Sequence, residues 1–205
     1  PSMVAAAVLS GLEPLLAEES PDWVVVQGDT TTVAAAGLAA YYARSKVAHV
    51  EAGLRTHDKW QPFPEELNRR FASVVADLHF APTDWARRNL LREGTPDHAI
   101  VLTGNPVIDA LLYTAALPPS AEAEAILGSP AAAGAEPHPT LILVTAHRRE
   151  NFGPGIEGIC LALKDIAHLY GGACRILYSV HPNPKAYEPA RRLLQDEPRI
   201  TLLPP

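Results

Sequence analysis

Two polar segments of the sequence could carry out acid–base chemistry. The first is His49-Val50-Glu51-Ala52-Gly53-Leu54-Arg55, and the second is Pro64-Glu65-Glu66-Leu67-Asn68-Arg69. Together they contain three carboxylates and two arginines, and the polar part of the first segment directly follows a short apolar strand predicted at residues 46–50. Open α/β sheets hold their ligands at the carboxyl ends of parallel strands. The pattern therefore indicates a site of chemistry rather than a requirement of folding.

A third carboxylate-bearing segment, Gln27-Gly28-Asp29-Thr30, lies between a predicted strand and a predicted helix. One interpretation is that Asp29 or a following threonine caps the helix. A compatible one is that Asp29 emerges at the ligand edge of the sheet. Because neighbouring parallel strands lie about 5 Å apart, we expect Asp29, Glu51 and Arg55 to cluster. Carboxylates this close together can act as an acid and a base.

The start of the predicted helix at residues 65–75 has two interpretations. Proline followed by acidic residues is a favourable helix start, because acidic side chains complement the helix dipole. This accounts for one of the two glutamates. For Glu65 we predict catalysis or contact with a substrate, in combination with Glu51.

A second group of polar residues follows the strands predicted at residues 140–145 and 175–180. The first strand leads into His147, Arg148 and Arg149, and the second leads into His181. A single histidine in such a place is often structural, but two adjacent arginines suit a phosphate or diphosphate, which guanidinium groups bind through paired hydrogen bonds. The two histidines lack the spacing of metal ligands, so we expect no metal site.

The elements that position these residues alternate between strand and helix along the chain. This order predicts the α/β class, with mostly parallel sheets and helices on their faces. We expect a first domain at residues 1–116 that lacks its first strand or strands. A proline- and alanine-rich linker at 117–139 leads to the first part of a second domain at 140–205.

Composition narrows the functional classes. The 205 residues are 47% hydrophobic with a net charge of −6, which argues against a nucleic-acid partner. No apolar run approaches the roughly 18 residues of a membrane span, so we expect no membrane partner. Cys160 and Cys174 fit small core residues of a protein in a reducing compartment. These features predict a cytoplasmic protein.

The ordered motifs resemble those of the non-hydrolysing UDP-N-acetylglucosamine 2-epimerases. The resemblance covers nearly the whole chain and is carried by residues 28–32, 49–55, 64–69, 104–109 and 147–151. It implies a glycosyltransferase-B-like architecture, in which two Rossmann-like domains hold a nucleotide sugar in the cleft between them. It also implies interconversion of UDP-GlcNAc and UDP-ManNAc for surface polysaccharide synthesis, by elimination of UDP to a glycal intermediate and re-addition.

The resemblance implies a role for each matching residue. The catalytic residues would be Asp29, Glu51, Glu65 and His147, and His181 would contact the uridine diphosphate. We predict further substrate contacts at five residues: Arg55, Arg69, Asn105, Arg148 and Arg149. The resemblance implies no cofactor and no metal, and a homodimer.

The sequence also departs from the family pattern at several places, and other functions compete with epimerisation. Ala146 stands where the family usually has glycine and Pro106 where threonine is frequent, while motifs expected before residue 1 and after residue 205 are missing. We therefore expect the 205-residue piece alone to be inactive or barely folded. The rivals are a hydrolysing 2-epimerase that releases UDP and ManNAc, an inactive nucleotide-sugar-binding module, and a sugar transferase of the same architecture. The transferase would need an acceptor site that the sequence does not indicate.

Overall fold

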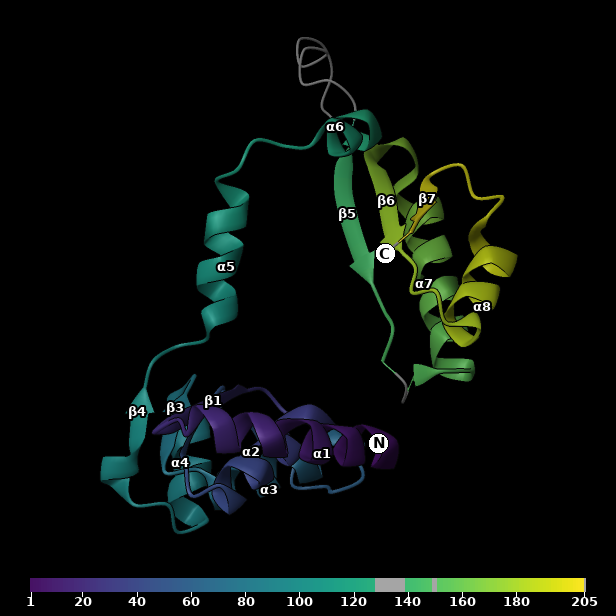
Figure 1. Ribbon diagram of the computed structural model, residues 1–205. Helices are drawn as coiled ribbons and strands as arrows, with labels where there is room; N and C mark the ends of the chain where they lie inside the picture. The colour runs from purple at the N-terminus through teal and green to yellow at the C-terminus, as the bar shows by residue number, and fades with distance from the viewer. Residues whose placement is uncertain (128–138, 149–150, 205) are drawn as a thin grey trace. The chain divides into compact units, whose positions relative to one another are not determined.

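The chain consists of two compact α/β units. The computed structural model describes residues 1–127, 139–148 and 151–204, and the chain divides into Pro1–Pro118 and Pro119–Pro205. Each unit contains a parallel sheet with helices connecting its strands (Figure 1). The predicted α/β class with two parallel sheets is confirmed. The division falls inside the segment predicted as a linker, in which residues 128–138 lie outside the described residues.

The first unit contains a four-stranded sheet with the order β1-β2-β3-β4. Its elements follow one another along the chain as α1 (Ser2–Glu19), β1 (Trp23–Gln27), α2 (Thr31–Tyr42), β2 (Lys46–Val50), α3 (Glu65–Val75), β3 (Leu78–Ala81), α4 (Asp84–Arg92), the 3₁₀ turn η1 (Asp97–Ala99), β4 (Ile100–Leu102) and α5 (Pro106–Ala115). Because all four strands are parallel, their carboxyl ends share one edge of the sheet.

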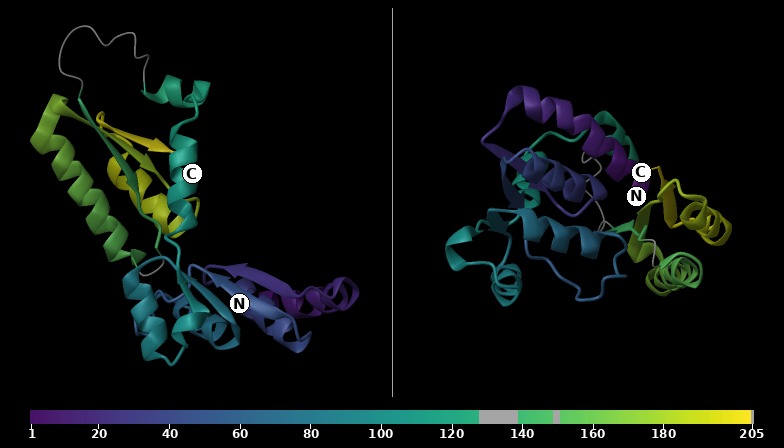
Figure 2. Two further views of the ribbon diagram at one scale, coloured as in Figure 1. Left: turned by 90° about the vertical axis from the view of Figure 1, so that its left-hand side faces the viewer. Right: turned by 60° about the horizontal axis from the view of Figure 1, so that its bottom comes forward.

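Helices cover one face of the first sheet. α2 packs against β1 and β2 and lies between α1 and α3, while α4 packs against β3 and β4 (Figures 1 and 2). Val26 and Val47 point to this face and form a core with Val33 of α2. Alternate residues point to the opposite face, where Val25 and Val101 are exposed.

The second unit contains a three-stranded sheet with the order β5-β6-β7. Its elements are α6 (Ala121–Leu127), β5 (Thr140–Thr145), α7 (Pro154–Tyr170), the 3₁₀ turn η4 (Gly171–Ala173), β6 (Cys174–Ser179), α8 (Pro184–Leu194) and β7 (Ile200–Leu203). Its core joins Ile156 and Cys160 of α7, Leu194 of α8 and Tyr178 of β6. Cys160 and Cys174 are both buried free thiols, as predicted.

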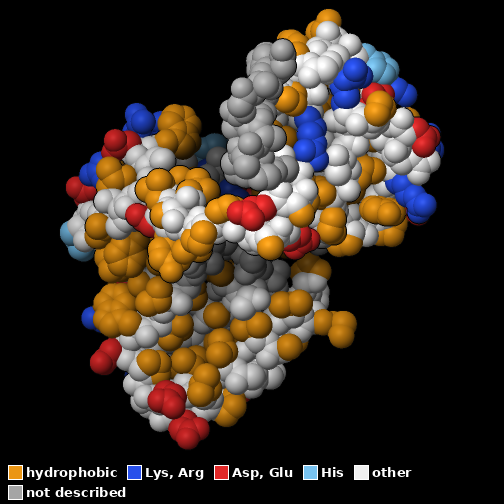
Figure 3. Space-filling view, turned by 90° about the horizontal axis from the view of Figure 1, so that it is seen from above, with side chains coloured by type: hydrophobic (Ala, Val, Ile, Leu, Met, Phe, Trp, Pro, Cys, Tyr) orange, Lys and Arg blue, Asp and Glu red, His pale blue; other side chains and the backbone are white. Residues whose placement is uncertain are grey.

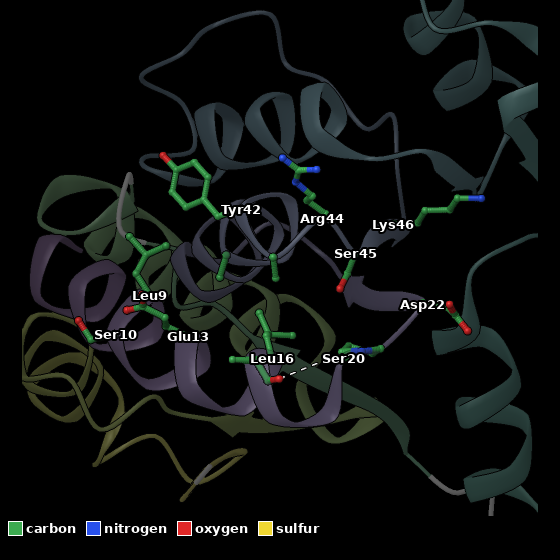
Figure 4. Close-up of a pocket in the computed structure, with 14 residues that line it drawn as sticks. Leu9, Ser10, Glu13, Leu16, Ser20, Asp22, Tyr42, Arg44, Ser45 and Lys46 are labelled. Carbon is green, nitrogen blue, oxygen red and sulfur yellow. Dashed lines mark hydrogen bonds between the residues drawn. The ribbon is translucent and has the colours of Figure 1, made fainter.

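The surface combines charged and hydrophobic side chains, as one face in Figure 3 shows. A pocket of about 790 Å³ opens between α1 and the end of α2 (Figure 4). It reaches Asp22, which precedes β1, and Lys46, which begins β2, so it lies at the amino ends of these strands. None of the residues predicted to do chemistry lines it. Within the described residues, none of the helices has the length and apolar character needed to cross a membrane.

Candidate functional site

The turn after β1 is held by two side chains of α3. Gly28 adopts a left-handed φ of 86°, a conformation that glycine tolerates best. The amide of Asn68 on α3 donates a 3.0 Å hydrogen bond to the carbonyl oxygen of Asp29. Arg69, one residue further along α3, forms an ion pair with the Asp29 carboxylate. The neighbouring Thr30, not Asp29, accepts the capping bond from the backbone of α2, so the side chain of Asp29 is available for another role.

Glu51 lies beside this turn. A Cβ atom built on Gly28 would be 3.9 Å from Oε2 of Glu51, so the Glu51 carboxylate lies next to the residue that precedes Asp29. Glu51 also has a left-handed φ of 67°, which costs a non-glycine residue roughly 1–3 kcal/mol and is concentrated at functional sites. The neighbouring strand ends therefore bring these two predicted carboxylates to one region.

The Glu51 carboxylate is contacted from the end of β4. The amide nitrogen of Asn105 lies 3.1 Å from its Oε1 atom, while the amide oxygen of Asn105 accepts a hydrogen bond from the backbone of Val107 and caps α5. One amide thus starts a helix and orients a carboxylate. Asn105 was predicted to contact the substrate, and that contact stays a prediction.

The two adjacent glutamates at the start of α3 have different surroundings. Glu66 is fully buried. Its carboxylate accepts hydrogen bonds from the backbone nitrogens of Thr56 and His57, at 3.0 and 3.2 Å, and lies 3.5 Å from a guanidinium nitrogen of Arg69. Glu65 is half-buried, and its carboxylate has no hydrogen-bond or ion-pair partner among the described residues. Glu66 therefore fastens the preceding loop, whereas Glu65 is available for chemistry.

Arg55 does not join the carboxylates at the strand ends, contrary to our expectation. Its side chain is fully buried and donates to both oxygens of Glu93, at 2.9 and 2.7 Å, and to the hydroxyl of Ser73 at 2.9 Å. Burial opposes ionisation of Glu93, but the hydrogen bond and charge of Arg55 lower the pKa of Glu93 below its ordinary value. The guanidinium is thus engaged inside the unit, and the predicted contact of Arg55 with a substrate stays a prediction.

Arg69 occupies a central position in the first unit. It contacts Asp29 and Glu66 together, and its side chain is only 12% exposed. Its charge therefore faces one carboxylate from the turn after β1 and another from its own helix. Whether it also contacts a substrate, as predicted, stays a prediction.

Two buried histidines of the sheet were not among the predicted site residues. His49 and His79 are register partners on β2 and β3, and both are buried. The ring Nε2 of His49 lies 2.8 Å from the carbonyl oxygen of Gly28. Burial, reinforced by the charge of Arg55 and opposed by this hydrogen bond, lowers the pKa of His49, while burial lowers the pKa of His79 to about 4. Their signal in the sequence was a polar ring inside an otherwise apolar strand.

The second unit brings its two predicted histidines together. Thr145 and Ser179, which end β5 and β6, are register partners, and His147 and His181 each follow two residues later. Their rings stack with centroids 5.5 Å apart and planes inclined by 10°. The backbone nitrogen of Asn183 donates to Nδ1 of His181 at 3.1 Å. The two rings thus form one exposed polar surface at the carboxyl edge of the sheet.

The predicted arginines of the second unit lie beside this histidine pair in the sequence. Arg148 directly follows His147 and is exposed. Arg149 lies outside the described residues. The predicted diphosphate contacts of both arginines stay predictions. Within the described ranges, no three His, Cys, Asp or Glu side chains gather closely enough to hold a metal ion.

Comparison with known proteins identifies the class to which this arrangement belongs. The sequence model of a family described as UDP-N-acetylglucosamine 2-epimerase matches residues 1–205. The chain therefore belongs to the UDP-N-acetylglucosamine 2-epimerase family. It is 47% identical over 205 residues to the UDP-N-acetylglucosamine 2-epimerase of Escherichia coli K12, and the match covers 98% of this chain and 54% of that protein. A putative enzyme of this name from Thermotoga maritima is 44% identical, covering 100% of this chain and 52% of the relative.

Solved structures show the same fold. The UDP-GlcNAc 2-epimerase of Neisseria meningitidis, bound to UDP-GlcNAc, superposes with a TM-score of 0.88 at 39% identity, covering 98% of this chain and 54% of that one. MnaA of Staphylococcus aureus, solved with UDP, gives a TM-score of 0.88 at 40% identity, covering 100% and 53%. The chain thus spans about half the length of the relatives that it matches.

Proposed function

We propose that the protein containing this chain is a non-hydrolysing UDP-N-acetylglucosamine 2-epimerase that interconverts UDP-GlcNAc and UDP-ManNAc. The observation that carries the proposal is the position of the Glu51 carboxylate against Gly28, one residue before Asp29. Two carboxylates from neighbouring strands are what a proton transfer on each face of a sugar carbon requires. The relatives from Neisseria meningitidis and Staphylococcus aureus, which were solved with UDP-GlcNAc and UDP, support the substrate class.

The chemistry explains why several carboxylates are needed. The hydrogen at C2 of the sugar is not adjacent to a carbonyl, so a base cannot remove it to form an enolate. Instead a carboxylate takes the C2 proton, the C–H electron pair forms the C1=C2 double bond, and the C1–O bond breaks as UDP leaves with its electrons. UDP then adds back to C1 while a proton returns to the other face of C2. Each direction requires one group that accepts a proton and one that donates it.

The first unit offers three carboxylates for these proton transfers. The guanidinium of Arg69 contacts Asp29, and the neutral amide of Asn105 contacts Glu51. The carboxylate of Glu65 has no hydrogen-bond or ion-pair partner among the described residues. These different surroundings suit groups that must act in opposite directions. We assign the proton transfers to Asp29, Glu51 and Glu65, without an order among them.

The second unit offers groups for the departing diphosphate. His147 and His181 present stacked rings at the carboxyl edge of β5 and β6, and Arg148 follows in the chain. Cationic and N–H groups aimed at a leaving diphosphate stabilise the charge that develops as the C1–O bond breaks. We assign this role to His147 with Arg148 and Arg149, and contact with the uridine diphosphate to His181.

The cellular setting forms part of the same proposal. We place the protein in the cytoplasm as a homodimer, with residues 1–116 and 140–205 as parts of two domains joined by a linker at 117–139. The buried free thiols of Cys160 and Cys174 support a reducing compartment. The resemblance to the epimerase family supports the dimer.

The reaction can be tested by following solvent hydrogen into the product. The protein containing this chain is incubated with UDP-GlcNAc in deuterated water, and the sugars are analysed by NMR and mass spectrometry. We expect UDP-ManNAc with deuterium at C2. Release of UDP with free ManNAc would indicate the hydrolysing reaction instead, and binding of UDP-GlcNAc without exchange would indicate a binding module.

Substitutions in the same assay test the assigned residues. Glu51→Gln and Asp29→Asn should each lower the exchange rate by about 10²- to 10⁴-fold, the usual contribution of a general acid or base. Glu18→Gln, at an exposed position on α1, serves as a matched control and should exchange at the normal rate. Full exchange in both Glu51→Gln and Asp29→Asn would contradict the assignment.

A further inference from the structure

His49 is a buried polar residue inside an apolar strand. Its ring has no exposed surface, and it lies on the helix-covered face of the sheet in register with Val26 of β1. The Nε2 atom is 2.8 Å from the carbonyl oxygen of Gly28. Because a carbonyl oxygen only accepts hydrogen bonds, the proton of the neutral ring is on Nε2.

The other ring nitrogen shows that packing alone does not explain this histidine. Nδ1 of His49 is buried and has no hydrogen-bond partner among the described residues. A buried acceptor without a partner costs free energy that a valine or leucine at this position would avoid. The bond from Nε2 to Gly28 is therefore the feature that distinguishes histidine from an apolar residue here.

The two peptide groups that flank Asp29 are each held by a side chain. His49 holds the carbonyl of Gly28, which belongs to the peptide group before the Asp29 Cα atom. Asn68 holds the carbonyl of Asp29, which belongs to the peptide group after it, at 3.0 Å. When the planes on both sides of a Cα atom are fixed, the direction of its Cα–Cβ bond is fixed as well.

We propose that His49 is a positioning residue that aims the carboxylate of Asp29 through the carbonyl of Gly28, with Asn68 holding the following peptide group. The inference rests on the proposed function, in which Asp29 transfers a proton. Arg69 then contacts a carboxylate whose backbone is already held in place. His49 contacts neither the substrate nor the reacting atoms, and it acts as a neutral hydrogen-bond donor.

Two substitutions separate the donated bond from the bulk of the ring. His49→Gln keeps a nitrogen donor near the position of Nε2, whereas His49→Leu keeps apolar volume and removes the donor. In the protein containing this chain, we expect His49→Leu to lower kcat about 10- to 100-fold, because misplacement of a reacting group by about 1 Å has an effect of this size. KM should change less than about 2-fold, and His49→Gln should recover most of the lost kcat.

His79 provides a matched control. It is the register partner of His49 on the next strand and is also buried, but its ring lies near the backbone of Ala76 at the end of α3 rather than at the turn before Asp29. His79→Leu should change stability while leaving kcat within about 2-fold. If His79→Leu lowers kcat as much as His49→Leu does, or if His49→Gln is as slow as His49→Leu, the proposal is wrong.

A third variant covers the case in which His49→Leu does not fold. Asn68→Ala, on the half-buried surface of α3, removes the hydrogen bond to the other peptide group. It should also lower kcat with little change in KM. Normal kcat in Asn68→Ala would contradict the proposal.

A measurement without substrate separates this inference from the proposed function. With selective ¹⁵N labelling, the amide resonance of Asp29 should move in His49→Leu, remain near its wild-type position in His49→Gln, and be unaffected by His79→Leu. If the variants show these shifts but the wild-type protein does not epimerise UDP-GlcNAc, the proposed function fails while the positioning of Asp29 stands. An Asp29 resonance that is insensitive to His49→Leu would overturn the positioning itself.

Discussion

Asn105 and Glu51 are 54 residues apart in the sequence, yet the amide nitrogen of Asn105 donates a 3.1 Å hydrogen bond to the Glu51 carboxylate. Parallel pairing from β2 through β3 to β4 brings the two strand ends to one edge of the sheet. This contact holds a carboxylate whose backbone is in the left-handed region. The orientation of Glu51 therefore depends on the whole sheet rather than on its own loop.

The first prediction concerns this contact. Asn105→Ser and Asn105→Asp both keep an oxygen that can cap α5, but neither donates an amide hydrogen to Glu51. A hydrogen bond to a charged group contributes about 1.5–3 kcal/mol, so we expect kcat to fall about 10- to 100-fold in Asn105→Ser. The fall should be larger in Asn105→Asp, which places a second carboxylate beside Glu51. Circular dichroism checks the helix, and a normal kcat in both variants would remove Asn105 from the site.

The second prediction separates the adjacent glutamates. Glu66→Gln places an amide group where a buried carboxylate accepts two backbone hydrogen bonds and faces Arg69. We expect it to lower the free energy of unfolding by about 2–4 kcal/mol. Glu65→Gln should change that free energy by less than about 0.5 kcal/mol while slowing deuterium exchange at least about 100-fold. Urea denaturation and the exchange assay measure the two effects, and the opposite pattern would exchange the roles of these residues.

The third prediction concerns pH. The pKa of His79 falls from 6.5 to about 4 on folding, so between these values the unfolded chain binds a proton that the folded chain does not. The free energy of unfolding must then decrease as pH falls through this window. Above pH 6.5 this residue makes it no more dependent on pH. One pKa unit corresponds to about 1.4 kcal/mol, which gives about 3 kcal/mol by pH 4. Urea denaturation of wild type and His79→Leu between pH 7.5 and 4.5 should show a smaller loss in the variant; equal losses would contradict the prediction.

The fourth prediction concerns the backbone beside Glu51. A Cβ atom built on Gly53 would lie 2.3 Å from the carbonyl oxygen of Ala86, and Gly53 has a φ of 87°. Gly94 has a similar φ of 92°, but a Cβ there would meet no described atom within 4 Å. Gly94→Ala should therefore lower the free energy of unfolding by only about 1 kcal/mol, the cost of a left-handed backbone for a residue with a Cβ atom. Gly53→Ala should cost several times as much, because α4 must move away. Thermal unfolding measures both, and equal costs would show that the contact with α4 relaxes freely.

Much of the fold could be predicted because its signals are local. The helix predicted at residues 65–75 is α3 (Glu65–Val75), and the strand predicted at residues 46–50 is β2 (Lys46–Val50). Both follow from the spacing of apolar residues and from the proline and acidic residues at the helix start. The position of Glu51 beside the turn that carries Asp29 could also be predicted, since parallel strands end at one edge.

The partners of the charged residues could not be predicted in this way. Arg55 was expected beside Glu51, but it binds Glu93, 38 residues further along the chain. The sequence contains several carboxylates that could pair with it, and only the path of α4 brings Glu93 to its guanidinium.

The sequence by itself determined the alternation of strands and helices, the strand ends that carry polar residues, and the family to which the chain belongs. The tertiary structure alone decided that Glu66 is enclosed while Glu65 is available, and that His49 contacts the turn before Asp29. The physical reason is the distance along the sequence over which each interaction acts. Hydrophobic periodicity and helix capping act over a few residues, whereas burial and hydrogen bonding of a side chain depend on neighbours that only the folded chain brings together.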